Sequence, residues 1–200
     1  MSKFLELINK QRSEKKEEKF EGTFLEYLEK LQDDPDIAKP AHKRLYDAIK
    51  NKGVNKMDNE DPRKKKIFND DNIKIYDYFK DEFFGNERVI EKLMHFLKSA
   101  ALRGEESRQV LLLMGPVGAG KSALTEHIKD ALDGEVYYHL DGDPQKGEPL
   151  QLVPRSLRGN FEEMLGVKIE GDLSPVARWR LLEEFKGKYE NFTVKSSTFS

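Results

Sequence analysis

The sequence predicts an α/β protein in which helices flank a parallel sheet, preceded by a small helical unit. Two apolar runs of strand length, residues 109–114 (QVLLLM) and 135–140 (EVYYHL), are separated by a helical pattern over residues 122–132. A strand, a helix and a second strand in this order favour a parallel pair joined by a right-handed crossover. Amphipathic spacing in the first 50 residues predicts the helices of the N-terminal unit.

Local patterns define this helical unit and divide the chain. Thr23 and Glu26 fit a capping box at the start of one helix, and a second apolar helical face lies downstream of it. Residues 53–72 contain few apolar side chains, which is typical of a linker or an exposed loop. We therefore expect a helical N-terminal region with its linker over residues 1–72, and a second domain over residues 73–200.

Further patterns place elements in the second domain. Asn86 fits the N-cap position of a helix that carries an apolar stripe, and Ser174 with Pro175 fits the start of another helix. Residues 191–194 (NFTV) are typical of a further strand. The stripe after Asn86 consists of Val89, Leu93, Phe96, Leu97 and Ala100.

Composition excludes several classes of protein. Charged residues make up 36% of the chain and hydrophobic residues 37%, which is typical of a soluble protein with a core. The 35 basic and 37 acidic residues leave a net charge of −2, so neither a nucleic-acid partner nor an acidic membrane is expected. The absence of cysteine excludes disulfides and thiolate metal sites. Because no signal-peptide core or membrane-spanning apolar run occurs, we expect a cytoplasmic protein.

The turn between the first strand and its helix, GPVGAGKS, matches the whole Walker A pattern. Glycines allow backbone N–H groups to curl around phosphates, and the following helix adds the positive end of its dipole. Lys121 is expected to reach the β- and γ-phosphates of ATP, and the hydroxyl of Ser122 to ligate Mg²⁺. The candidate phosphate-binding residues are Gly115, Pro116, Val117, Gly118, Ala119, Gly120, Lys121 and Ser122.

A second segment, DEFFGNE at residues 81–87, suggests a site for the base. It lies upstream of the loop and ahead of a helix, and it resembles the segment that covers adenine in the AAA+ ATPases, a class of P-loop NTPases. Phe83 and Phe84 would supply apolar walls, and Gly85 would leave room for the base. The alternative is a lead-in to the helix that packs on the core.

An acidic residue that handles the metal and the attacking water is harder to find. Asp141 and Asp143 follow the strand at residues 135–140, but no second acid follows Asp141 directly, since Gly142 does. No other segment offers an apolar strand ending in acids, so we leave the catalytic residues unknown. We expect the chain to be a fragment of a longer protein, and to have little activity alone.

The same acids support an alternative function. LDGD at residues 140–143, after a GAGKS loop, is similar to the adenylylsulfate kinases, in which the acids would touch the acceptor substrate. This small-molecule kinase reading lacks the arginine that usually follows the acids in that family. It also leaves the first 100 residues unexplained.

Taken from end to end, the chain resembles the N-terminal AAA+ region of the PrkA family, bacterial proteins called serine protein kinases. The similar segments occur in the family's order. They are FEGTFLEYLE (20–29), AHKRLYDAIKNKG (41–53), EFFGNERVIEKL (82–93), LLLMGPVGAGKS (111–122), EPLQLVP (148–154) and VKIEGDLSP (167–175). The loop has Gly118 and Ala119 where the family pattern has a serine and a glycine, and LDGDPQKG (140–147) replaces a shorter, cysteine-containing turn.

The resemblance implies an ATP- and Mg-dependent AAA+ module, residues 73–200 being part of it. It also implies a longer protein with serine/threonine protein kinase or ATPase activity, a protein substrate or partner, and AAA+-type homo-oligomers. A third possibility is a non-catalytic nucleotide-sensing or assembly module whose N-terminal helices bind a partner.

Other polar and aromatic candidates have simpler interpretations. His127 and His139 are expected to be packed or surface residues, and Arg155 and Arg158 to form surface salt bridges. Trp179 is expected to anchor the core.

Overall fold

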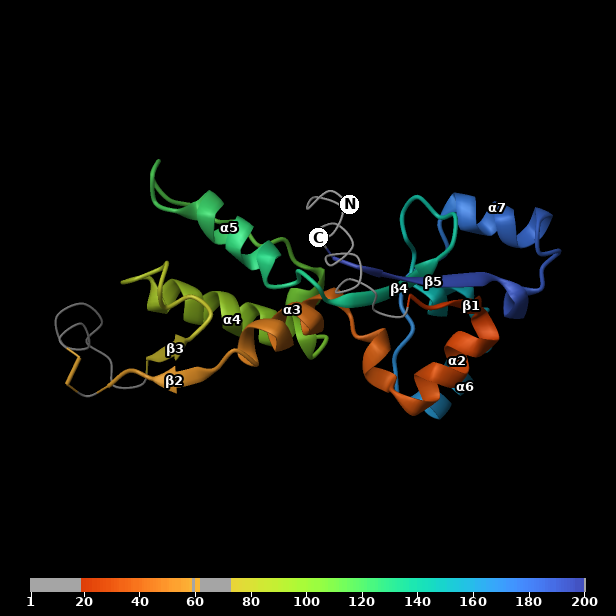
Figure 1. The fold of residues 1–200 in the computed structure, drawn as a ribbon, viewed down its shortest axis with the longest axis horizontal. Coiled ribbons are helices and arrows are strands. Elements are labelled where there is room, and N and C mark those ends of the chain that lie inside the picture. Colours follow the sequence, from red (N-terminus) through yellow and green to blue (C-terminus); the bar gives the residue numbers. More distant parts are fainter. Residues whose placement is uncertain (1–18, 59, 62–72, 200) are drawn as a thin grey trace, which may run out of the picture. The chain divides into compact units, whose positions relative to one another are not determined.

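The computed structural model describes residues 19–58, 60–61 and 73–199 (Figure 1). These residues form two compact units. The first combines the described residues before Lys39 with Val136–Phe199, and the second comprises Lys39–Glu135. The units do not follow the expected division at residues 72 and 73, because the two N-terminal helices belong to different units.

The first unit is built on a three-stranded sheet with the strand order β1-β5-β4, in which both pairs are antiparallel. Gly22 lies opposite Val194, and Tyr138 lies opposite Ser196. The strands are β1 (Glu21–Thr23), β4 (Val136–Leu140) and β5 (Thr193–Thr198). The helices are α2 (Phe24–Asp33), α6 (Arg158–Leu165) and α7 (Pro175–Glu183), with short 3₁₀ turns η1 (Pro35–Ala38), η4 (Pro149–Leu152) and η5 (Tyr189–Asn191).

The capping box at the start of α2 is confirmed. The hydroxyl of Thr23 accepts a hydrogen bond from the backbone N–H of Glu26 at 3.3 Å. The carboxylate of Glu26 accepts one from the backbone N–H of Thr23 at 2.6 Å. Two N–H groups that a helix start leaves without partners are thereby satisfied. At α7, Ser174 is likewise the N-cap and Pro175 the first helical residue, as predicted.

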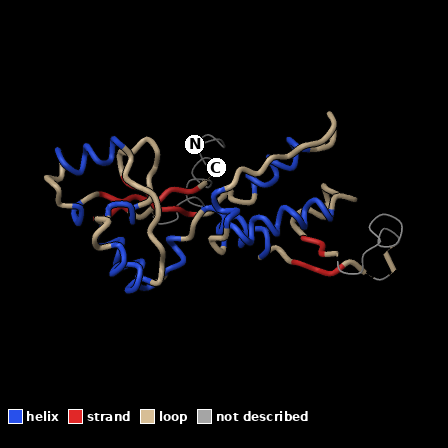
Figure 2. Tube along the Cα trace, turned by 180° about the vertical axis from the view of Figure 1, so that it is seen from behind, coloured by secondary structure: helices blue, strands red, loops and turns tan. Residues whose placement is uncertain are grey.

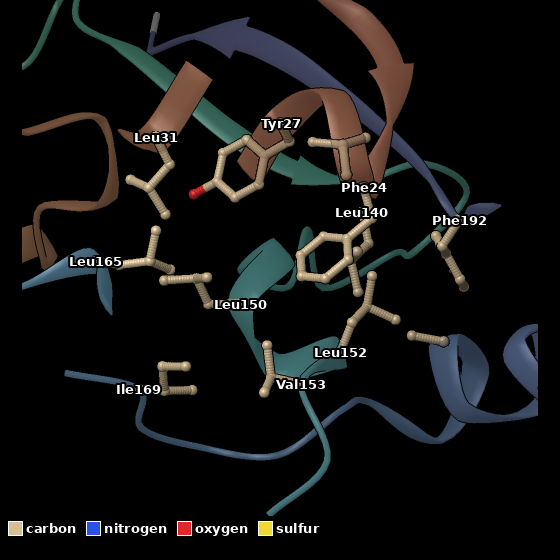
Figure 3. Packing of buried hydrophobic residues seen from close by; sticks show 12 residues of the cluster. Phe24, Tyr27, Leu31, Leu140, Leu150, Leu152, Val153, Leu165, Ile169 and Phe192 are labelled. Carbon is tan, nitrogen blue, oxygen red and sulfur yellow. The ribbon is translucent and has the colours of Figure 1, made fainter. Parts of the chain in front are cut away.

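The core of the first unit lies between the sheet and α2, η4 and α6 (Figure 3). Aromatic side chains from α2 pack against aliphatic side chains that the chain supplies more than 100 residues later. The fully buried members include Phe24, Tyr27, Leu31, Leu140, Leu150, Val153, Phe192 and Val194. The first unit therefore depends on both of its chain segments.

The second unit is mainly helical. It contains α3 (Ala41–Lys50), β2 (Val54–Lys56), β3 (Lys74–Tyr76), α4 (Glu87–Ala101), the 3₁₀ turn η3 (Glu105–Arg108) and α5 (Lys121–Asp130). β2 and β3 form an antiparallel pair, and α3 packs on α4 (Figure 1). The core consists of Ile49, Tyr76, Phe79, Phe83, Ile90, Leu93, Met94, Leu97 and Leu124. Within the described residues, no helix is long and apolar enough to cross a membrane.

Asn86 is the N-cap residue of α4, as predicted, but the buried face of this helix differs by part of a turn from the predicted stripe. Leu93, Leu97 and Ala100 are buried as expected. Val89 is 50% exposed, whereas its neighbour Ile90 and Met94 are buried.

The predicted parallel strand pair is not formed by the described residues. The strand at residues 135–140 exists as β4, but its partner is β5, which runs antiparallel to it. Residues 109–114 are not a strand, and Figure 2 draws the stretch before α5 as loop. Val110, Leu112 and Met114 are 92%, 73% and 84% exposed. A strand needs a neighbour for its backbone hydrogen bonds, and no described residue pairs with this stretch.

Candidate nucleotide-binding site

The Walker A segment forms an exposed loop that ends at the first residue of α5. Gly118 has φ 80° and Gly120 has φ 76°, a left-handed conformation that costs other residues about 1–2 kcal/mol. A Cβ atom at either glycine would have no neighbour within 4 Å, so the backbone angle and not crowding requires glycine here. Gly120 is the N-cap residue of α5 and supplies no side-chain hydrogen bond to the first turn. The N–H groups of that turn are therefore left for another acceptor.

Lys121 is folded over this loop. Its ammonium donates hydrogen bonds to the carbonyl oxygens of Gly115 and Pro116 at 2.9 and 2.7 Å. The hydroxyl of Thr125 donates to the carbonyl of Lys121 at 3.0 Å, inside the helix. One fixed positive charge thus lies beside the loop and next to the positive end of the helix dipole.

Ser122 follows in the first turn of α5 and is exposed. In the part of the chain that the structure describes, no group of three or more His, Asp or Glu side chains could hold a metal ion. The hydroxyl of Ser122 is an exposed oxygen donor at this loop, and Mg²⁺ accepts one or two protein oxygens together with several waters.

The segment expected to cover adenine belongs to the same unit as the loop. Its three candidate residues differ in exposure. Phe83 is 7% exposed and packs in the core, whereas Phe84 is 72% exposed. Gly85 has φ 83°, and a Cβ atom there would have no neighbour within 4 Å. Phe84 is thus largely exposed and Gly85 has room for a side chain, while Phe83 packs in the core.

Two hydrogen bonds connect α5 to the chain just before this segment. The phenol of Tyr78 donates to the backbone carbonyl of His127 at 2.7 Å. The Nε2 atom of His127 lies 2.9 Å from the backbone carbonyl oxygen of Tyr78. The sequence predicts His127 only as a packed or surface residue and indicates no role for Tyr78. A lone histidine without partners at a known spacing carries no sequence signal for such a contact.

The acids of LDGD, by contrast, serve the first unit. Asp143 is 5% exposed, and it accepts hydrogen bonds from Ser174 Oγ at 2.8 Å and from the backbone N–H of Gly147 at 2.9 Å. Asp141 lies 3.2 Å from the ammonium of Lys195. Its backbone carbonyl accepts a hydrogen bond from Arg180. Both acids thus have partners within the first unit, which argues against the acceptor-binding role expected in the small-molecule kinase alternative.

The remaining candidates are structural. Arg155 pairs with Asp172, and Arg158 lies 3.7 Å from the same carboxylate, so the predicted salt bridges are confirmed. His139 is buried, with Nε2 2.9 Å from Ser197 Oγ. Trp179 is 59% exposed, so the prediction that it anchors the core is wrong. It lies on the outer face of α7.

The chain is similar in sequence to a known class of proteins. The family model that matches residues 22–200 describes an AAA domain, which places the chain among the P-loop NTPases of α/β fold. Within this class, the matching family model is that of the PrkA AAA domain, and the chain belongs to this family.

Curated relatives agree with this assignment. The chain is 37% identical to the "ATP-dependent protease PrkA" of Bacillus subtilis (strain 168) over 203 residues, which cover 98% of this chain and 30% of the relative. It is 36% identical to the "Serine/threonine kinase YeaG" of Escherichia coli (strain K12) over 187 residues, which cover 90% of this chain and 28% of the relative. The chain thus spans less than a third of either relative. No solved structure matches it.

Proposed function

We propose that this chain is the ATP-binding AAA+ module of a PrkA-like serine/threonine protein kinase or ATPase. The observation that carries the proposal is the loop before α5. It combines two left-handed glycines, a helix N-terminus without a side-chain cap, and the ammonium of Lys121. These are the groups that hold a chain of phosphates, because each offers a hydrogen-bond donor or a positive charge to the same small space.

Each candidate residue has a separate task in this proposal. The backbone N–H groups of residues 117–122 bind the phosphate oxygens, and Lys121 exchanges its two carbonyl partners for the β- and γ-phosphates. The hydroxyl of Ser122 ligates Mg²⁺, which neutralises phosphate charge when it is bound. Phe84 and Gly85 contact the adenine, and Phe83 holds them in place.

The names of the relatives support ATP binding more than any one reaction. One is called an ATP-dependent protease and the other a serine/threonine kinase. Both activities use ATP, so nucleotide binding is the step that either activity requires. We infer that the longer protein acts on a protein substrate or partner, forms oligomers of the AAA+ type, and completes a parallel sheet around residues 109–114. That stretch is apolar and exposed, as a strand without its neighbours would be.

The proposal is tested by titrating the chain with ATP and Mg²⁺ in a calorimeter. Lys121→Ala should weaken binding about tenfold or more, because a hydrogen bond to a charged group contributes roughly 1.5–3 kcal/mol. Lys129→Ala is the matched control: it lies on the same helix, is exposed, and pairs with Glu126. Its affinity should equal that of the wild type. Equal affinities of the Lys121→Ala variant and the wild type would refute the assignment of the loop.

A further inference from the structure

His127 of α5 packs against three aromatic rings of the segment that precedes Phe84. Its ring centroid is 4.4 Å from that of Tyr78 and 5.5 Å from those of Phe79 and Phe83. The side chain is 16% exposed. His127 follows Lys121 by six residues, which places it about 9 Å along α5 from the phosphate loop. His127 therefore contacts Phe83 of the proposed base segment and lies on the helix that begins at the phosphate loop.

Both ring nitrogens of His127 face oxygen atoms that can only accept hydrogen bonds. Nε2 lies 2.9 Å from the backbone carbonyl oxygen of Tyr78, and Nδ1 lies 3.2 Å from a carboxylate oxygen of Glu82. Neutral imidazole carries one N–H, so it satisfies only one of these acceptors. A neutral ring protonated on Nε2 donates to the carbonyl of Tyr78, whereas the contact of Nδ1 with Glu82 becomes an ion pair only when the ring carries a second proton.

The neighbouring titratable groups make Glu82 the partner that responds to this proton. Burial, and then the negative charges of Asp130 and Glu82, raises the pKa of the Tyr78 phenol. Tyr78 therefore remains a donor to the carbonyl of His127 throughout the physiological pH range. Glu82 has a 62% exposed side chain, so it is free to turn into water when Nδ1 no longer carries a proton.

We propose that His127 is a positioning residue, which fixes α5 against the segment from Tyr78 to Gly85, and that its pair with Glu82 is a latch closed by protonation. The inference rests on the proposed function, in which the two ends of ATP are held by α5 and by this segment. With the latch closed, the two ends of the site keep their spacing before the nucleotide arrives. With the latch open, ATP binding must restore that spacing, and affinity falls.

The first experiment measures affinity for ATP with Mg²⁺ by calorimetry at pH 6 and pH 8, the range in which histidine changes its charge. Glu82→Gln removes the carboxylate and keeps the shape of the side chain. Asp133→Asn, at an exposed position of the same unit outside both candidate segments, is the control for charge. The loss of affinity between pH 6 and pH 8 should be about two- to five-fold larger in the wild type than in Glu82→Gln, as expected for a partly exposed ion pair. Asp133→Asn should behave like the wild type. The protonation of ATP itself affects all three proteins equally, so it does not change the comparison.

The second experiment needs no nucleotide. A double-mutant cycle with Glu82→Gln and His127→Phe, measured by urea unfolding, isolates the coupling between the two side chains. Phenylalanine keeps the ring packing and removes the hydrogen bond to Tyr78 and the ion pair with Glu82; His127→Gln replaces it if the first variant does not fold. The coupling should change the unfolding equilibrium about two- to five-fold at pH 6 and vanish at pH 8.

The outcomes separate the latch from the proposed function. Coupling that is the same at both pH values, or absent at pH 6, overturns the latch whatever ATP does. Binding of ATP by all variants with one common pH profile also overturns it, and leaves the proposed function intact. Failure of the wild type to bind ATP overturns the proposed function and the positioning role together, while the cycle still decides whether the pair responds to protonation.

Discussion

Replacing Asp143 by alanine should destabilise the first unit, although this residue follows a Walker A loop in a motif that also resembles a substrate site. The carboxylate is 5% exposed. It accepts hydrogen bonds from the backbone N–H groups of Gln145 at 3.2 Å and Gly147 at 2.9 Å, and from Ser174 Oγ at 2.8 Å. Ser174 Oγ in turn accepts from the N–H of Ala177 at 3.0 Å and caps α7. One side chain therefore connects the turn after β4 to the start of α7.

The size of the effect follows from these bonds. A hydrogen bond to a charged group contributes roughly 1.5–3 kcal/mol, and a donor left buried without a partner adds its desolvation cost. The three bonds share one carboxylate and are not additive, so we expect Asp143→Ala to lower the free energy of unfolding by about 3 kcal/mol. Asp143→Asn should lose roughly half as much, because its amide oxygen, in the place of Oδ1, still accepts from Gln145 and Ser174 while its NH₂ group meets the N–H of Gly147.

The assay is urea unfolding followed by far-ultraviolet circular dichroism. Glu163→Ala is the control, since Glu163 is exposed on α6 of the same unit, and it should change stability by less than about 0.5 kcal/mol. Equal stability of Asp143→Ala and Glu163→Ala would contradict the structural role of the buried carboxylate. It would also return Asp143 to the set of possible substrate-binding residues.

Two further predictions concern single contacts of the first unit. Gly142 has φ 68°, and a Cβ atom there would clash with Nη1 of Arg180. Gly142→Ala should therefore lower stability by about 1–2 kcal/mol from the backbone angle, with a further loss from displacing the guanidinium. Urea unfolding unchanged by this variant would contradict this prediction. At the start of α2, the hydrogen bond from the backbone N–H of Thr23, with that from its hydroxyl, lowers the pKa of Glu26 below its ordinary value of 4.5. Because the folded-state pKa is the lower one, the stabilisation is present above the unfolded-state pKa and is lost as the pH falls through the folded-state pKa. Wild-type protein should therefore be more stable than Glu26→Gln at pH 7, and the difference should shrink below pH 4.5; a gap independent of pH would refute this.

Helix starts could be predicted from the sequence because their signals are local. Thr23 and Glu26 are three residues apart, and the bonds between them need no information from the rest of the chain. Ser174 and Pro175 are adjacent, and each has a fixed preference for its position in a first turn. The Walker A pattern is local in the same sense, since its glycines, its lysine and the first residues of its helix lie within eight residues.

The sheet could not be predicted, because strand pairing joins distant residues. β4 and β5 were both expected as strands, but the residues between them gave no sign that they would pair antiparallel. The expected partner of β4, residues 109–114, has the composition of a buried strand and no neighbour among the described residues. The pair of His127 and Glu82 was missed for the same reason, since 45 positions separate the two in sequence and only the fold brings them together.

The difference between Lys121 and Asp143 shows why charge near a phosphate loop is a poor guide to function unless its partners are known. Both side chains are hydrogen-bonded in the structure, but the bonds differ in what it costs to break them. Lys121 donates to carbonyl oxygens of an exposed loop, which water can satisfy when the ammonium leaves. Asp143 is buried, and its donors would be left without acceptors if it turned toward a substrate. A residue that is to bind a ligand must be able to exchange its partners at low cost. By this criterion Lys121 is available for phosphate, whereas Asp143 is committed to the fold.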